Sequence, residues 1–275
     1  MNIGIVGTGN MGKILIDAFL ISSAVTEQQL FIINRSKAKA EHIKCVYPNI
    51  QVMNSVEDVI NHCDFIFICV KPVDIYSLLQ QCHTTIRKEQ CIISITSPIS
   101  VKQLESVVPC SVARVIPSIN NRVLSGTSLL TFGESCKYHH QKTIIQLMEK
   151  ISAPVVIEEE FTRVASDITS CGPAFFTFLL RRFIEAAVNE TQIPEEQASL
   201  LATKMLIGMG QLIEQEVYTL ETLQEKVCVK GGITGEGIKV LEAEVGQMFH
   251  HVIQATHAKF FDEKKKISEQ FGIIN

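Results

Sequence analysis

The segment Gly7-Thr8-Gly9-Asn10-Met11-Gly12 constrains the fold of this chain more than any other feature. It follows an apolar stretch typical of a strand, residues 2–7, and it opens a stretch of helical spacing that runs from Met11 to Ser22. In that setting the first glycine permits a tight turn, the second lets a phosphate approach the backbone, and the third allows close packing of helix on strand. The segment therefore predicts a dinucleotide-binding unit.

Strand and helix patterns alternate through the first half of the chain. Residues 64–70 form a continuous apolar run, which is typical of a strand buried on both faces of a sheet. Further strand patterns cover residues 30–34, 91–96, 112–117 and 127–132. This alternation predicts an α/β Rossmann-type fold with a doubly wound parallel sheet.

From Thr162 onward no strand pattern is evident. Helical patterns cover residues 163–190, 194–217, 219–229 and 236–270. The stretch 172–188 is apolar on more than one face, so another subunit is expected to cover part of it. We therefore expect two domains, a nucleotide-binding domain over residues 1–158 and an all-α dimerisation domain over residues 159–275.

Composition narrows the classes of function. A net charge of −4 and a single short basic run at 264–266 leave no basic surface for nucleic acid. Nine scattered cysteines, no secretory leader and no apolar run of membrane length indicate a cytoplasmic protein away from membranes. The histidine pairs at 139–140 and 250–251 are expected on surface helices and lack a third ligand, so no metal site is expected.

The residues that follow the second predicted strand, 30–34, indicate which dinucleotide the chain binds. An enzyme that prefers NAD usually has an acidic residue there, whereas this chain has Asn34, Arg35 and Ser36, followed by Lys39. A guanidinium and a hydroxyl can bind a 2′-phosphate that a carboxylate would repel. We expect NADP(H) in preference to NAD(H). The alternative is that Arg35, Lys37 and Lys39 form only a solvated helix start.

Six stretches in order resemble the pyrroline-5-carboxylate reductase family: "GTGNMG", "NRSKAK", "VKP", "RVIP", "CGPAF" and "GGITGEG". The resemblance spans nearly the whole chain and is nearest to the family's divergent late-competence ComER-type branch. Members of the family reduce a cyclic imine, 1-pyrroline-5-carboxylate, to L-proline with NAD(P)H. The resemblance implies a homodimer that forms through the C-terminal helices, and an imino acid as the small-molecule substrate.

The same resemblance assigns site residues. It implies that Thr234 is the catalytic residue and hydrogen-bonds the imine nitrogen, while the amides of its glycine loop bind the substrate carboxylate. The alternative is that Thr234 only caps its helix. The motifs and the resemblance together predict that the cofactor is bound by Gly7, Thr8, Gly9, Asn10, Met11, Gly12, Asn34, Arg35, Ser36, Lys39, Cys69, Val70, Lys71 and Pro72. The predicted substrate-binding residues are Ser118, Cys171, Gly172, Pro173, Ala174, Gly231, Gly232, Ile233 and Thr234.

The chain departs from the family pattern mainly in the substrate half. Ser118 replaces an asparagine of the family pattern, Cys171 and Val229 each replace a serine, and Lys230 replaces a proline. The asparagine that usually precedes the "VKP" strand in the family falls on Val56, although Asn54 and Ser55 lie close. Each lost hydrogen bond to a charged group is worth about 1.5–3 kcal/mol, so two losses weaken binding severely. Lys230 could restore carboxylate binding by its charge, although a solvated lysine is the commoner case.

Two other functions stay open. A catalytically weakened NADP(H)-binding regulatory protein would fit an intact cofactor half and an altered substrate half. A β-hydroxyacid dehydrogenase is disfavoured, because such enzymes use a lysine on the first long interdomain helix and residues 163–190 contain none. Cys171 could be reactive, but a small residue at a tight helix contact is the more common role.

Overall fold

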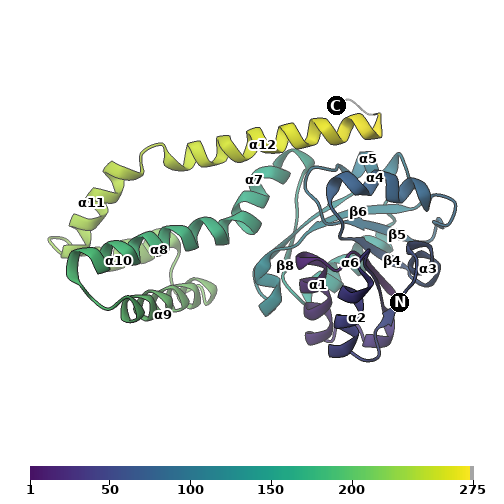
Figure 1. Cartoon of the computed structure of the whole chain (residues 1–275). Helices are drawn as coiled ribbons and strands as arrows, with labels where there is room; N and C mark the ends of the chain where they lie inside the picture. The colour runs from purple at the N-terminus through teal and green to yellow at the C-terminus, as the bar shows by residue number, and fades with distance from the viewer. Residues whose placement is uncertain (273–275) are drawn as a thin grey trace. The chain divides into compact units, whose positions relative to one another are not determined.

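The computed structural model of the protein describes residues 1–272, which form two compact units (Figure 1). The first unit comprises Met1–Cys171 together with the C-terminal residues from Ala255 on, and the second comprises Gly172–Gln254. The chain therefore leaves the first unit once and returns to it. These limits differ from the expected domain boundary at residues 158–159, which stays a prediction.

An eight-stranded sheet with the order β3-β2-β1-β4-β5-β6-β7-β8 forms the centre of the first unit. The mostly parallel, doubly wound α/β arrangement confirms the expected fold class. Every residue of β1, β4 and β5 is buried, as the apolar runs predicted. The strands are β1 Ile3–Val6, β2 Leu30–Ile33, β3 Gln51–Val52, β4 Phe65–Ile68, β5 Cys91–Ser94, β6 Ser111–Ile116, β7 Thr127–Phe132 and β8 Ala153–Val156.

Three features of the sheet correct the sequence prediction. Strand β7 pairs with β6 in the antiparallel direction, because a short connection through the 3₁₀ turn η2 (Ile119–Val123) is too short for a parallel crossover. Strand β3 was not predicted, since two residues carry no pattern. Strand β8 was not predicted either, because it lies at the sheet edge, is mostly exposed and contains Pro154.

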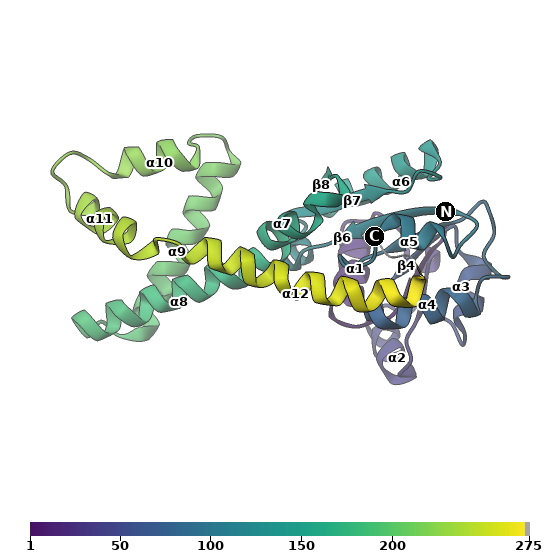
Figure 2. The ribbon, with the colours of Figure 1, turned by 90° about the horizontal axis from the view of Figure 1, so that it is seen from above.

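Helices cover both faces of the sheet. One core cluster joins the sheet to α1 (Asn10–Ile21), α2 (Lys37–Val46) and α6 (Tyr138–Glu149). The other core cluster contains residues of α3, α4 and α5 together with Ile267 and Phe271 from the end of α12. Figure 2 shows this end of α12 beside α4 and α5. The bounds of these helices are α3 Val56–His62, α4 Pro72–Gln81, α5 Val101–Glu105 and α12 Met248–Phe271.

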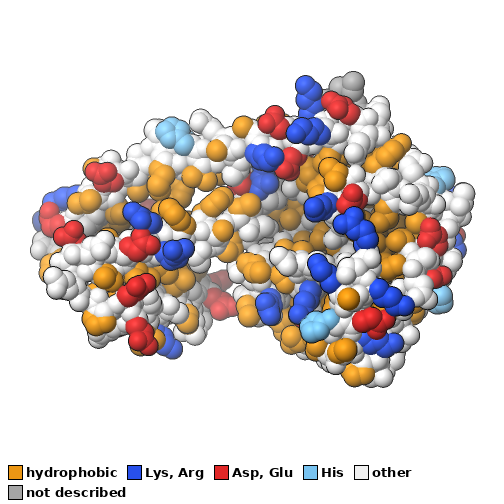
Figure 3. All heavy atoms as spheres, viewed as in Figure 1, with side chains coloured by type: hydrophobic (Ala, Val, Ile, Leu, Met, Phe, Trp, Pro, Cys, Tyr) orange, Lys and Arg blue, Asp and Glu red, His pale blue; other side chains and the backbone are white. Residues whose placement is uncertain are grey.

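The second unit is built of helices only, as expected. It contains α8 (Gly172–Thr191), α9 (Glu195–Glu214), α10 (Leu220–Val227), α11 (Ile233–Val245) and the start of α12. Among its residues, all of which the structure describes, only Gly172, Ala198 and Ala202 are buried. Large apolar side chains on α8, α9 and α11 are open, and many are visible in Figure 3. Such a unit has too little interior of its own to be stable alone.

Two long helical patterns prove to be interrupted. The pattern over 236–270 is the two helices α11 and α12, which separate at Gly246, where φ is 40°. The pattern over 163–190 comprises α7 (Thr162–Ser166), a π-helical turn (Asp167–Cys171) and α8. Within residues 1–272 no helix combines the length and the apolar character that crossing a membrane requires.

One expected surface residue lies in the core. His140 on α6 is buried, its Nδ1 atom lies 2.8 Å from Ser111 Oγ, and its ring meets the Phe65 ring edge-on with centroids 5.2 Å apart. The neighbouring His139 is exposed. The two rings lie with centroids 4.2 Å apart, yet only one of them is buried, which the doublet alone does not reveal.

Candidate cofactor and substrate site

The three glycines of the first loop meet three different steric demands. Gly7 has φ of 102°, and a Cβ atom there would lie 2.7 Å from the carbonyl oxygen of Cys69. A Cβ atom on Gly12 would lie 2.1 Å from the carbonyl oxygen of Gly7. Gly9 has no atom within 4 Å of its Cβ position, so this point of the loop is open. Two glycines allow the loop to close on the sheet, and the third leaves room for a ligand.

The start of α1 suits a pyrophosphate. Gly9 is the N-cap residue, and no side chain caps the helix. The amides of the first turn therefore stay available to an anion, and the helix dipole favours one. Thr8 adds a buried Oγ1 atom that has no hydrogen-bond partner among residues 1–272. A phosphate oxygen would give this hydroxyl an acceptor, so the residues fit a dinucleotide.

Asn34 holds the end of β2 against the glycine loop. Its Oδ1 atom accepts a hydrogen bond from the Thr8 amide at 3.0 Å, and its Nδ2 atom donates to the Ser36 carbonyl oxygen at 3.1 Å. The Gly7 amide donates to the Ile33 carbonyl oxygen at 2.8 Å. The two predicted cofactor segments are therefore one connected structure.

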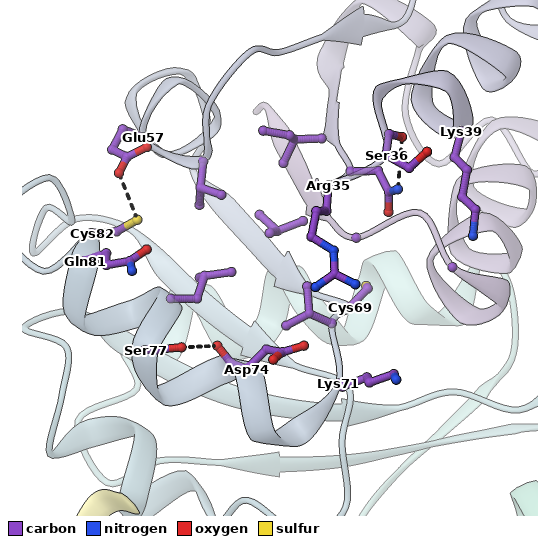
Figure 4. Close-up of a pocket in the computed structure, with 18 residues that line it drawn as sticks. Arg35, Ser36, Lys39, Glu57, Cys69, Lys71, Asp74, Ser77, Gln81 and Cys82 are labelled. Atoms are coloured by element: carbon purple, nitrogen blue, oxygen red, sulfur yellow. Dashed lines mark hydrogen bonds between the residues drawn. The ribbon is translucent and has the colours of Figure 1, made fainter.

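A pocket of about 700 Å³ brings most of the predicted cofactor residues together (Figure 4). Its volume is in the usual range for sites that hold small molecules and cofactors. Of the predicted residues, the pocket is lined by Gly7, Gly9, Asn34, Arg35, Ser36, Lys39, Cys69, Val70 and Lys71. It is not lined by Thr8, Asn10, Met11, Gly12 and Pro72.

Positive charge and free donors gather at the β2 end of the pocket. Figure 4 shows Arg35 extending across the pocket toward the segment of Cys69 and Lys71, with Ser36 and Lys39 at one side. Ser36 is the N-cap residue of α2, yet its side chain makes no capping bond. Lys37 turns away and donates to Asn54 Oδ1 at 3.4 Å. Hence Arg35, Ser36 and Lys39, rather than Lys37, are placed to bind an anion in the pocket.

The sequence prediction missed the opposite wall of the pocket. This wall is contributed mainly by α3 and α4, and its lining residues are Val56, Glu57, Asp74, Ser77, Leu78, Gln81 and Cys82. The positions on α4 lie on one helix face, since 74, 77, 78 and 81 follow the i, i+3, i+4, i+7 pattern, but this spacing alone does not tell a ligand from solvent. On α3, Val56 was noted only as the position of an asparagine in the family pattern, and Glu57 was not noted at all.

The two thiols of the pocket stay protonated at neutral pH. Burial raises the pKa of the Cys69 thiol far above its usual value. Burial, followed by the nearby Glu57 carboxylate, raises the pKa of Cys82 to about 11. Cys82 Sγ donates to Glu57 Oε1 at 3.7 Å. Since a thiolate is the reactive form of cysteine, these residues serve as walls of the pocket and not as nucleophiles.

The second glycine loop opens α11 in the second unit. Gly231 has φ of 77°, and a Cβ atom on Gly232 would lie 2.9 Å from Val229 Cγ2. Gly232 is the N-cap residue and no side chain caps the helix, so the alternative that Thr234 is the cap is wrong. Thr234 lies in the first turn and is exposed, as is Ile233. The Gly232 amide donates to the Val229 carbonyl oxygen at 2.9 Å, whereas the amides of the first turn of α11 and the Thr234 hydroxyl have no partner among residues 1–272. The pocket described above is lined wholly by the first unit.

Ser118 is buried and fully engaged within the first unit. Its Oγ atom donates to the Thr169 carbonyl oxygen at 2.8 Å, and its amide donates to Asn121 Oδ1 at 2.8 Å. To bind a substrate it would have to exchange one of these bonds. Its role in binding stays a prediction.

Cys171 closes the π-helical turn, and its Sγ atom accepts a hydrogen bond from Arg163 Nη2 at 3.3 Å. Arg163 also pairs with the buried Asp167 at 2.9 Å. Gly172 is buried, and Pro173 and Ala174 begin α8. Arg163 thus links the Cys171 and Asp167 side chains, and the substrate role of Cys171, Gly172, Pro173 and Ala174 stays a prediction.

Arg114 of the "RVIP" stretch has a structural role. It is buried, pairs with Glu159 Oε1 at 2.8 Å and donates to the Ile99 carbonyl oxygen at 3.1 Å and to Thr131 Oγ1 at 3.2 Å. Burial lowers the pKa of the guanidinium, and Glu159 opposes that shift. The residue ties β6 to the 3₁₀ turn η3 (Glu159–Phe161) that precedes α7.

Comparisons with known proteins agree with this architecture. A family model described as pyrroline-5-carboxylate reductase dimerisation matches residues 159–261, and one described as NADP oxidoreductase, coenzyme F420-dependent, matches residues 2–98. ComE operon protein 4 of Bacillus subtilis is 53% identical over 99% of this chain and 100% of that protein. Pyrroline-5-carboxylate reductase 3 of the same organism is 28% identical over 98% of each chain.

Solved structures show the same fold. The crystal structure of Plasmodium falciparum pyrroline carboxylate reductase with NADP bound superimposes with a TM-score of 0.81, at 21% identity and over 98% of both chains. At that identity the likeness establishes the fold, and the relative of 53% identity establishes the family. The chain therefore belongs to the pyrroline-5-carboxylate reductase family, in which it is similar to ComE operon protein 4.

Proposed function

We propose that the chain reduces a small cyclic imine that carries a carboxylate, with NADPH as the hydride donor. The reaction that we infer is the conversion of 1-pyrroline-5-carboxylate to L-proline, which the names of several relatives support. The observation that carries the proposal is the pocket, where the open loop at Gly9 adjoins Arg35, Ser36 and Lys39. The absence of an acidic residue among Asn34, Arg35 and Ser36 supports NADPH over NADH.

In this proposal, bound NADPH would supply a hydride to the imine carbon. The imine C=N bond becomes a C–N single bond, and the ring nitrogen takes up one proton. The uncapped amides at the start of α11 bind the substrate carboxylate, which the helix dipole favours. The Thr234 hydroxyl holds the ring nitrogen in place. Because an alcohol is a poor acid, the proton comes from water or from an imine that is already protonated.

The proposal includes a homodimer in the cytoplasm. The match of residues 159–261 to the dimerisation family model supports a second copy as the cover for the open apolar side chains. Free cysteines, five of them buried, are typical of a reducing compartment and support the cytoplasmic location.

An assay of NADPH oxidation with 1-pyrroline-5-carboxylate tests the function. We expect turnover by the full-length protein, a loss of kcat of about tenfold or more in Thr234→Ala, and recovery of most activity in Thr234→Ser. The affinity for NADPH should stay the same in both variants, since the pocket is lined by the other unit. A folded dimer that binds NADPH but never oxidises it at saturating imine would contradict the proposal.

A second candidate is an NADP(H)-binding protein with weak or no catalysis. The engagement of Ser118 Oγ with the Thr169 carbonyl oxygen favours it, because that hydroxyl is not free for a substrate. Val229 and Lys230, which replace a serine and a proline of the family pattern, favour it as well. Calorimetry separates the two functions: tight binding of NADPH that neither proline nor its imine precursor alters would support this candidate.

A further inference from the structure

A second cavity, of about 240 Å³, lies between α1 and α2 within the first unit. It shares no lining residue with the cofactor pocket, because the N-terminal ends of the two helices line that pocket and their later turns line this cavity. Its volume is below the range of about 300–1,000 Å³ that holds drug-sized ligands, so an occupant has to be small. No residue of this α1–α2 cavity has a part in the reaction described so far.

Basic side chains line the α1–α2 cavity from three elements. They are Lys13 on α1, His42 on α2 and Arg122 on η2, which packs against α1. None of these three side chains forms a hydrogen bond or an ion pair within residues 1–272. Figure 3 shows Lys and Arg side chains and a histidine gathered over α1 and α2. The lysine and the arginine are therefore available to an anionic group of a ligand.

One acidic side chain, Asp17 on α1, lines the same cavity. Tyr47, the C-cap residue of α2, donates from its hydroxyl to Asp17 Oδ1 at 3.0 Å. Burial, followed by this hydrogen bond to Asp17, raises the pKa of Tyr47 to about 12, so the hydroxyl keeps its proton and continues to donate at neutral pH. Among residues 1–272 no hydrogen bond or ion pair uses Asp17 Oδ2. This oxygen is therefore free to accept from a ligand.

The rest of the cavity surface is mostly apolar and includes Ile21 and Val46, which are 61% and 58% exposed. The cavity thus combines two permanent positive charges, on Lys13 and Arg122, with the carboxylate of Asp17 and an apolar wall. Asp17 would repel a dianion such as phosphate, and an amine alone would leave both cations unpaired. A zwitterion with an apolar side chain provides a partner for each of these groups.

We propose that the α1–α2 cavity binds a free α-amino acid with an aliphatic side chain. The amino-acid carboxylate pairs with the guanidinium of Arg122 and with Lys13, while the ammonium group donates to Asp17 Oδ2. The aliphatic side chain covers Ile21 and Val46, which are open in the free protein. The site is separate from the proposed reaction, which uses the cofactor pocket and the loop that opens α11.

A simpler explanation is that these charged side chains are only solvated and bind nothing. The chain offers matched controls, since Lys44 and Glu41 are exposed residues of α2 that do not line the cavity. Lys44→Gln removes the same charge as Arg122→Gln, and Glu41→Gln removes the same charge as Asp17→Asn. An asparagine at position 17 keeps an oxygen that can accept from the Tyr47 hydroxyl, so this variant retains the bond between α1 and α2.

The test is isothermal titration calorimetry of the full-length protein with L-leucine and two analogues. In 4-methyl-2-oxopentanoate an oxygen replaces the ammonium group, and 3-methylbutylamine lacks the carboxylate. We expect L-leucine to bind with a Kd below about 1 mM and at least about tenfold more tightly than either analogue. Arg122→Gln and Asp17→Asn should each weaken this binding about tenfold or more, whereas Lys44→Gln and Glu41→Gln should retain it. Thermal unfolding of each variant confirms that it is folded.

Three results would overturn the assignment and leave the reductase proposal standing. One is the absence of any heat of binding with L-leucine up to about 10 mM, well above the expected Kd. Another is equal affinity of the wild type for L-leucine and 4-methyl-2-oxopentanoate, since the ammonium group would then have no partner. The third is binding that is lost in Thr234→Ala but unchanged in Arg122→Gln, which would place the amino acid at the loop before α11.

Discussion

The glycine loop shows at the scale of single residues how one residue type meets different demands. At Gly12 the missing side chain allows helix α1 to touch the loop, because a Cβ atom would lie 2.1 Å from the Gly7 carbonyl oxygen. At Gly9 nothing in the protein occupies the space, and φ of −69° is open to any residue. Packing therefore requires glycine at position 12, whereas only a ligand requires it at position 9.

The variants Gly9→Ala and Gly12→Ala separate these two roles. Gly12→Ala forces the loop and helix apart, so we expect it to destabilise the protein by about 1–3 kcal/mol. Gly9→Ala should cost less stability, about 0.5–1 kcal/mol, since alanine fits the free structure but is a poorer N-cap residue than glycine. It should nevertheless weaken NADPH binding about tenfold or more, because its methyl group fills the space of the pyrophosphate. Urea unfolding and NADPH titration measure the two effects. Equal loss of stability in both variants would be evidence against an open loop.

The part of the pocket that the sequence predicted consists of residues that directly follow a strand. The loop at Gly9 and the group Arg35, Ser36 and Lys39 were found in this way. The α4 face that lines the pocket was not found, because a stripe of mixed polarity facing a ligand resembles one facing solvent. The engagement of Ser118 with the Thr169 carbonyl oxygen joins residues 51 positions apart, and no local pattern records it.

At the scale of elements, burial on both faces decides which strands the sequence reveals. The three central strands β1, β4 and β5 are buried throughout, and their apolar runs predicted them. Edge strands have less to bury, so β3 and β8 left no pattern. Helix α6 shows that a buried position can also carry a polar residue. His140 is buried, although the two adjacent histidines predicted an exposed segment.

The burial of His140 predicts a dependence of stability on pH. Burial lowers the pKa of His140 in the folded protein, and His139 and Lys137 lower it further. The unfolded chain then takes up the proton first, below about pH 6.5, so protonation favours unfolding. Stability contributed by neutral His140 is present above that pH and is lost as the pH falls.

Urea unfolding at about pH 8 and about pH 5.5 measures this effect. We expect the midpoint of the wild type to fall at the lower pH, and the fall to be smaller in His140→Gln. The variant His42→Gln removes an exposed ring from another helix, α2, and should retain the dependence on His140. An unchanged fall in His140→Gln would assign the dependence to other groups.

At the scale of the whole molecule, the first unit is built from two separate stretches of the chain. The first unit needs the end of α12, where Ile267 and Phe271 are buried in the core beside α4. Gln103 donates to Ser268 Oγ at 3.1 Å, and the rings of Tyr76 and Phe271 meet with centroids 4.9 Å apart. A cut of the chain at residue 158 or 171 would therefore remove part of the core of the sheet domain, which the alternation of strand and helix patterns does not reveal.

The second unit is a continuous stretch of chain but has almost no interior. Another copy of the chain is expected to cover its exposed apolar side chains. Phe183 on α8 is 66% exposed and Leu241 on α11 is 57% exposed. Burial of such side chains is worth about 1.5–3 kcal/mol each, and a charge there would oppose association. We expect Phe183→Glu combined with Leu241→Glu to sediment as a monomer and to lose reductase activity. Binding of NADPH should persist, because the first unit alone lines the pocket. Glu190→Gln, an exposed change on α8, should leave the dimer intact. If the double variant remained a dimer, these faces of α8 and α11 would not be the interface.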